Sequence, residues 1–413
     1  MIETISAWPS VRFRHEAAPL LKEREQYLTH LLQQGFDRAV VRSTAAYLVH
    51  VVRVMNMTLL RSVGQEEIDT AGRAWATYEG PLRRKLKRRG SPIMFVRVAE
   101  RWLRFHGQLE SPPTHPFQQL IVEFIDAMRS TRGLAPPTVL GYSSKAFGFL
   151  KWFGERHDSL EFVSLRDIDE FIASKREEGW SVRTLATQCQ ALRSFFGYAE
   201  IRGWCVPGIP LGIRSPRIPK YEDRPKGPTW VEVRRLIGSA SGSAPNELRA
   251  KAILLLFAIY GLRSSEVAGL RLNDFDWRSE TFSVQRAKRG GIQQYPIQYE
   301  VGEAIIQYLR KGRPHCSSRH VFVSTCRPHG LIRPGPMWQI VGLRMRKLRI
   351  ESEHVGPHSL RHACATRLLK KGASLKEIAD FLGHRNLKSV SIYARYDTRS
   401  LRKVAAFSLA GVR

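Results

Sequence analysis

The sequence predicts a mainly α-helical protein whose last region is α+β, with a small antiparallel sheet. Apolar residues recur at helical spacing over residues 1–110 and again over 117–204, which is the pattern of amphipathic helices. In residues 281–297, two runs rich in β-branched and aromatic residues flank a Gly-Gly turn, and this pattern predicts a hairpin. Helical patterns return from residue 336 onward. We therefore expect helical modules first and a mixed region with the sheet last.

Proline-rich stretches divide the chain into four expected segments. A helical N-terminal module covers residues 1–110, and a second helical domain covers 111–206. Six prolines with Arg and Lys between them make 207–229 an extended basic linker, because proline forbids regular structure there. This linker is either a simple spacer or a strap over a phosphate backbone. The mixed region is 230–413.

The charge balance of the chain points to a polyanionic partner. The 413 residues contain 66 Lys and Arg against 37 Asp and Glu, a net charge of +29 that is spread over the whole length. A folded protein with such an excess most often binds nucleic acid. An anionic membrane surface is the weaker alternative, since no long basic amphipathic helix stands apart.

Cysteine usage and the apolar runs indicate a cytoplasmic protein. The five cysteines are scattered and form no CxxC pair, which suits a reducing compartment without a disulfide framework. The first 16 residues have no apolar run behind a basic stub, so we expect no signal peptide. The longest apolar run, residues 252–260, is too short to span a membrane.

The first candidate for chemistry is Arg263. We expect Gly261 to end a buried helix and Ser264 or Ser265 to cap the next one, with Glu266 in its first turn. An arginine at such a joint is held by packing while its guanidinium points outward. Taken alone, it is better interpreted as an ordinary surface arginine.

A second pair of candidates is His358 and Arg361, which lie three positions apart and so share one helix face. His and Arg one turn apart can bind the same anion, although a plain surface pair is the alternative. His362 is expected on a different face, with no role. The buried stripe of this helix is expected to consist of Leu360, Cys364 and Leu368.

The stretch "FLGHRNLKSVSIYARYD", residues 381–397, follows a helix that a capping box should start at Ser374 and that Gly383 should end. His384 comes at the turn, and Tyr393 and Tyr396 follow three residues apart. The bland interpretation is a solvated amphipathic helix. The alternative is that one tyrosine is a nucleophile.

The motifs of metal and nucleotide sites do not accompany these residues. The sequence has no acidic pair or triad at cation-binding spacing, no GxxxxGK[ST], no HExxH and no GxGxxG in a βαβ setting. Two arginines and a hairpin lysine, Lys288, could neutralise the transition-state charge of a phosphate by themselves. A tyrosine can form a covalent phosphoester. We therefore expect neither a cofactor nor a metal.

Together, "GLRSSE", Lys288 in a hairpin, "HSLRH", "LGH" and the later tyrosine resemble the tyrosine recombinase (phage-integrase-like) family in order and spacing. The resemblance covers about 230–396, and it implies that 230–413 is a catalytic domain with a C-terminal tail. Residues 117–204 resemble the family's helical core-binding domain. The first 110 residues are either an arm-like module or a second core-binding-like unit.

The resemblance implies a role for each candidate. The family's nucleophile lies nine residues after the histidine of LGH, which selects Tyr393 over Tyr396. Two arginines clamp the scissile phosphate, one histidine accepts a proton or binds the phosphate, a lysine protonates the leaving 5′ oxygen, and a second histidine hydrogen-bonds the phosphate. In that order, these residues are Arg263 and Arg361, His358, Lys288 and His384.

The hairpin departs from the family pattern, because Arg286 and Arg289 crowd the turn that holds Lys288. Either arginine is expected to touch the DNA backbone instead.

The implied partner is double-stranded DNA with a specific recombination site, and the implied role is integration, excision or transposition of a mobile element. Resolution of chromosome or plasmid dimers and type IB topoisomerase-like relaxation are the alternatives. Family tails often dock on a neighbouring subunit, so residues 398–413 are expected to do so in a DNA-bound tetramer. A tail packed on its own domain is the other possibility.

Overall fold

The computed structural model describes residues 9–77, 92–111, 115–218, 227–286 and 291–383. Its contacts divide the chain into two compact units: residues 62–67 with 108–222, and the remaining residues. The second unit includes both the N-terminal helices and the C-terminal region. Lys288, Arg289, His384, Tyr393, Tyr396 and the tail lie outside the described residues.

The N-terminal part is helical, as predicted. Every helix of this part except the first buries an apolar stripe, and Trp102, Phe95 and Leu48 are fully buried. Arg24 is also buried, and its guanidinium donates to the carbonyls of His15 (2.7 Å) and Ala18 (2.8 Å), which lack helical partners at the end of a helix. The helices are α2 (Pro9–Glu16), α3 (Leu21–Gln33), α4 (Arg38–Val54), α5 (Gln65–Thr77) and α7 (Pro92–Phe105).

The unit formed by residues 62–67 and 108–222, the central unit, is a helical domain with an aromatic core. Phe149 and Phe196 pack edge to face with ring centroids 5.6 Å apart, the geometry that aromatic rings prefer. A capping box stands at Ser164, because the Ser164 and Asp167 side chains accept each other's backbone N–H groups. The elements are α8 (Gln118–Ser130), α9 (Pro136–Gly154), the short 3-10 turn η1 (Leu160–Phe162), α10 (Leu165–Glu177), α11 (Val182–Ile201) and α12 (Ile209–Gly212).

The C-terminal region surrounds α14 (Pro245–Tyr260), which is buried on most faces as predicted. The predicted hairpin is present as β2 (Thr281–Gln285) and β3 (Ile292–Pro296), with Val284 opposite Gln293. A short third strand, β1 (Phe275–Asp276), completes an antiparallel sheet of order β1-β2-β3. The fold class is therefore the predicted one, mainly helical with a small sheet.

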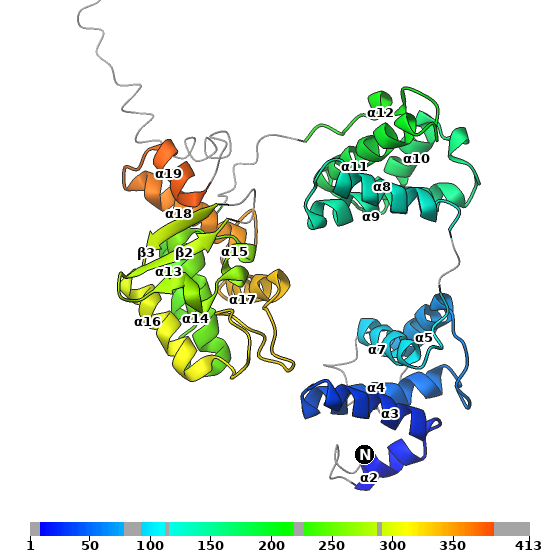
Figure 1. Ribbon diagram of the computed structural model, residues 1–413, viewed down its shortest axis with the longest axis horizontal. Helices are drawn as coiled ribbons and strands as arrows, with labels where there is room; N and C mark the ends of the chain where they lie inside the picture. The colour runs from blue at the N-terminus through cyan, green and yellow to red at the C-terminus, as the bar shows by residue number, and fades with distance from the viewer. Residues whose placement is uncertain (1–8, 78–91, 112–114, 219–226, 287–290, 384–413) are drawn as a thin grey trace, which may run out of the picture. The chain divides into compact units, whose positions relative to one another are not determined.

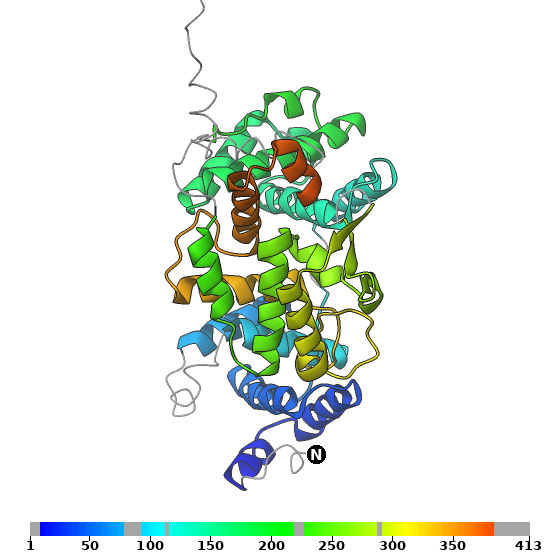
Figure 2. The ribbon, with the colours of Figure 1, turned by 90° about the vertical axis from the view of Figure 1, so that its left-hand side faces the viewer.

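Helices make up most of the remaining C-terminal region. They are α13 (Trp230–Gly238), α15 (Ser264–Gly269), the 3-10 turn η2 (Leu272–Asp274), α16 (Tyr299–Gln307), the π-helical turn η3 (Tyr308–Gly312), α17 (Pro334–Lys347), α18 (Pro357–Lys370) and α19 (Leu375–Leu382). Figures 1 and 2 both show α18 and α19, orange to red, side by side at one end of this region. They share a small apolar cluster that includes Cys364 and Leu382, and this packing holds the end of α19 next to the end of α14.

Candidate active site

Gly261 ends α14 in the left-handed conformation, with φ of 60°. A Cβ atom at this position would lie 2.5 Å from Cδ2 of Leu382, so glycine is needed both for the backbone angle and for the close approach of α19. This confirms the expected helix end. The next residues carry the chain directly to Arg263.

Arg263, not a serine, occupies the N-cap position of α15, so the expected serine cap is wrong. The Glu266 carboxylate accepts both the backbone N–H of Arg263 (2.8 Å) and its Nη1 group (2.7 Å). The acidic side chain in the first turn thus does what a serine hydroxyl would otherwise do, and at the same time it orients the arginine. The Arg263 side chain keeps 25% of its surface exposed.

Glu266 is a fully buried carboxylate shared by two arginines. Its second oxygen lies 3.1 Å from Nη1 of Arg286, and its side chain is 0% exposed. Burial alone would raise the pKa of Glu266, but the Arg263 backbone N–H and the charges of Arg286 and Arg263 outweigh it and lower the pKa. The carboxylate therefore stays ionised and holds two guanidinium groups in place.

Arg361 points inward, not outward. It is only 2% exposed, and its guanidinium donates to the carbonyls of Gly261 (2.5 Å) and Leu382 (2.7 Å). The expected buried stripe of α18 therefore has to include Arg361. The physical reason is that the ends of α14 and α19 expose carbonyls without helical partners, and a buried guanidinium is stable where such acceptors surround it.

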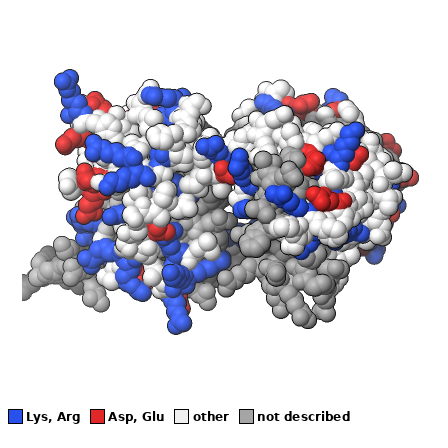
Figure 3. Space-filling model, turned by 90° about the horizontal axis from the view of Figure 1, so that it is seen from below, with Lys and Arg blue, Asp and Glu red and all other residues white. Residues whose placement is uncertain are grey.

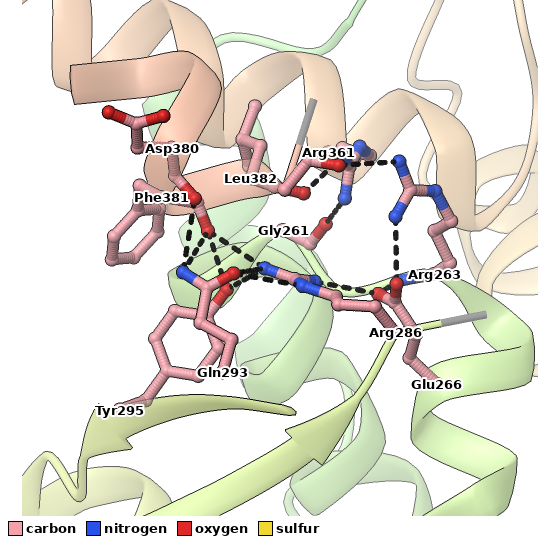
Figure 4. Close-up of polar contacts among 11 residues, drawn as sticks. Gly261, Arg263, Glu266, Arg286, Gln293, Tyr295, Arg361, Asp380, Phe381 and Leu382 are labelled. Carbon is pink, nitrogen blue, oxygen red and sulfur yellow. Dashed lines mark hydrogen bonds and ion pairs between the residues drawn. The ribbon is translucent and has the colours of Figure 1, made fainter. Parts of the chain in front are cut away.

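The end of α19 gathers three arginines, as Figure 4 shows. The carbonyls of residues 381, 382 and 383 accept from Arg286 (3.1 Å), Arg361 (2.7 Å) and Arg263 (3.4 Å), in that order. Gly383 closes the helix in the left-handed conformation, as predicted. Arg263 and Arg361, which are 98 positions apart in the chain, are thus brought to the two residues that directly precede His384.

His358 lies exposed near the start of α18, with its ring centroid 4.6 Å from that of His362. The expectation that His362 lies on a different face is therefore wrong, since residues four apart on a helix are neighbours. Partial desolvation of the ring, followed by the positive charges of His354, Arg361 and Arg263, lowers the pKa of His358. A neutral imidazole, able to accept a proton, is favoured at neutral pH.

Arg286 does not lie free at the hairpin surface, so its expected contact with DNA is wrong. Its side chain is 9% exposed and donates to Glu266, Gln293, Tyr295 and the Phe381 carbonyl. The sequence offered one signal of this arrangement, because polar Gln293 and Tyr295 alternate on the strand that pairs with β2. Their common partner could not be read from it.

Comparison with known proteins agrees with this geometry. The model of the phage integrase family matches residues 229–399, and that of the phage integrase N-terminal SAM-like domain matches 121–203. The tyrosine recombinase XerD of Yersinia pestis is 30% identical over 288 residues, which cover 69% of this chain and 95% of XerD. The chain belongs to the phage integrase family of tyrosine recombinases.

Two further relatives extend the likeness of this tyrosine recombinase. A protein named as an integrase/recombinase, y4rF of Sinorhizobium fredii, is 29% identical over an alignment of 421 positions. The alignment covers 98% of this chain and 95% of y4rF. The fold matches that of the Tn1549 transposon integrase in complex with transposon right end DNA, with a TM-score of 0.52 and 18% identity. That match covers 68% of this chain and 99% of the integrase.

The described residues of the recombinase contain neither a membrane-spanning helix nor a metal-binding cluster. No helix among them has the length and apolar character needed to cross a bilayer. No three His, Cys, Asp or Glu side chains in those same ranges gather as a metal ion would require.

Proposed function

We propose that this recombinase cleaves and rejoins DNA at a defined site through a 3′-phosphotyrosyl intermediate. The observation that carries the proposal is that Arg263 and Arg361 both donate to backbone carbonyls at the end of α19. His384 follows these carbonyls directly in the chain. Two guanidinium groups and two histidines suit the charge of a pentacoordinate phosphate. One such donor contributes about 10²–10³ in rate.

In the proposed cleavage step, Oη of Tyr393 attacks the scissile phosphorus and the bond from phosphorus to the 5′ oxygen breaks. His358 takes the tyrosyl proton. Its lowered pKa keeps the imidazole neutral, and therefore able to accept that proton, at neutral pH. Lys288 gives a proton to the leaving 5′ oxygen. The free 5′ hydroxyl of a partner strand then attacks the phosphotyrosyl bond and releases Tyr393, so the phosphodiester energy is conserved and no nucleotide cofactor is consumed.

We further propose that the recombinase acts on a mobile element, by integration, excision or transposition. The likeness to an integrase/recombinase over 98% of this chain supports this role, as does the fold shared with a transposon integrase. Resolution of chromosome or plasmid dimers by the same chemistry is the alternative. The place of action would be the prokaryotic cytoplasm, on DNA of the nucleoid.

The proposed assembly follows the four expected segments, 1–110, 111–206, 207–229 and 230–413. The helical domain and the C-terminal region would close around the duplex, and the basic linker would follow its backbone. Figure 3 shows Lys and Arg spread over one face of the described surface instead of confined to one patch, which suits many phosphate contacts and a steep salt dependence. Residues 398–413 would dock on a neighbouring subunit of a tetramer.

A suicide duplex tests this proposal. Duplexes taken from the DNA that flanks the gene carry a nick next to each trial position, so that the short 5′ product diffuses away and the covalent adduct accumulates on a denaturing gel. An adduct only at one defined site supports recombination. An adduct on every duplex indicates a relaxing enzyme, and no adduct with DNA still bound indicates a binding protein.

A further inference from the structure

We infer that Arg286 is a positioning residue of the active site, which fixes the base of the Lys288 hairpin to the end of α19. This inference rests on the proposed function. The residue lies two positions before Lys288, and its guanidinium contacts the carbonyl two residues before Gly383. It therefore joins the two chain segments that lead into Lys288 and His384.

Arg286 bridges three separate elements with one planar group. It reaches α15 through Oε2 of Glu266 (3.1 Å), β3 through Oε1 of Gln293 (2.9 Å) and α19 through the Phe381 carbonyl (3.1 Å). Only a guanidinium presents donors in a fixed fork that can serve three directions at once. A lysine would keep the charge near Glu266 but would lose most of these bonds.

The second strand of the hairpin strengthens the same link. The amide of Gln293 donates to the carbonyls of Asp380 (3.1 Å) and Phe381 (3.2 Å). Tyr295 donates its hydroxyl to Phe381 as well, and burial raises the pKa of Tyr295 to about 12, so this donor keeps its proton at neutral pH. Both strands of the hairpin are thus tied to the last turn of α19.

Gly383 shows how closely Arg286 approaches the backbone that precedes His384. A Cβ atom at Gly383 would lie 2.6 Å from Nε of Arg286, so any side chain at this position would displace the guanidinium. Arg286 also shares Glu266 with Arg263. Loss of Arg286 would leave Arg263 held by a carboxylate with one partner fewer, and would let the hairpin base move relative to the phosphate site.

The test measures single-turnover cleavage of the suicide duplex by the full-length chain at saturating protein. Arg286→Gln should slow cleavage by roughly 10–100-fold, since a displacement of about 1 Å can cost 10²-fold, while the DNA dissociation constant changes by less than about threefold. Arg286→Lys should remain nearly as slow, because it restores charge but not the bridge. Full activity of the lysine variant would overturn the inference.

Val301→Ala is the matched control for folding. Val301 lies on α16 with its side chain buried in the apolar core that the hairpin shares, so its truncation weakens that core and removes no polar contact. It should lower Tm and leave the cleavage rate unchanged at a temperature where every variant is folded. Equal losses in Val301→Ala and Arg286→Gln would overturn the inference. No adduct with the wild-type chain would instead overturn the proposed function.

Discussion

The central helical unit and the C-terminal region bury different kinds of side chain. The core of the central unit is built from aromatic rings, including Phe149, Phe171 and Phe196. The C-terminal region has an apolar core too, but it also encloses Glu266 and Arg361, which are 3% and 2% exposed. Buried charge is costly unless it is paired. The C-terminal region buries charged groups where three arginines meet, and such a cluster is a candidate site for catalysis. The aromatic core of the central unit contributes stability alone.

The largest expected effect is that of Tyr393→Phe, which removes the proposed nucleophile. Adduct formation should fall below detection while DNA binding stays within about twofold, because the missing hydroxyl forms the covalent bond. A denaturing gel and a binding titration measure the two quantities. Tyr396→Phe is the matched control and should still form the adduct. If Tyr396→Phe is inactive and Tyr393→Phe is not, the assignment by spacing fails.

Arg361→Ala should combine a loss of chemistry with a loss of stability. Cleavage should fall by about 10²–10³-fold, the usual effect of one lost donor to the transition state. Tm should fall as well, because the carbonyls of Gly261 and Leu382 would lose a buried partner. Phe149→Ala in the central unit should lower stability by about 3–5 kcal/mol with the cleavage rate of the folded protein retained. Equal effects of the two variants on that rate would erase the contrast between the regions.

Glu266→Gln should lower stability at neutral pH by about 3–5 kcal/mol, since it leaves the largely buried Arg286 and the partly exposed Arg263 without their carboxylate. The lowered pKa of Glu266 gives this effect a pH dependence. A carboxyl with a depressed pKa contributes stability above its ordinary value, near 4.5, and loses that contribution as the pH falls through the folded-state pKa. Urea unfolding from pH 7 to 3 should therefore show the difference between wild type and variant shrinking in acid. A constant difference would contradict the ionised, shared carboxylate.

The smallest effect compares the same capping box in the two regions. Ser164 starts α10 in the central unit and Ser374 starts α19, and removal of either hydroxyl should cost about 1 kcal/mol. Ser164→Ala should leave the single-turnover rate unchanged. Ser374→Ala should slow it a few-fold, because α19 carries the carbonyls that hold the three arginines. Equal rates in the two variants would show that the end of α19 does not depend on its start.

Sequence patterns were sufficient to predict those structural features that depend on neighbours within a few positions. Helical periodicity predicted the helices, β-branched runs around a Gly-Gly turn predicted β2 and β3, and the glycines 261 and 383 marked the two helix ends that meet at the site. The order of the motifs was sufficient to predict the family and the candidate residues Arg263, His358 and Arg361. All of these signals come from local backbone preferences or from short spacings.

The directions of the charged side chains, and the groups that they bind, follow from tertiary packing. Arg361 turns inward to a carbonyl 100 positions away, and Arg263 reaches one 120 positions away. Arg286, expected at the DNA, is instead a buried link to α19. No local pattern encodes these contacts, because the free carbonyls at helix ends attract whichever guanidinium the fold brings near. The partner of each buried charge is therefore set by packing.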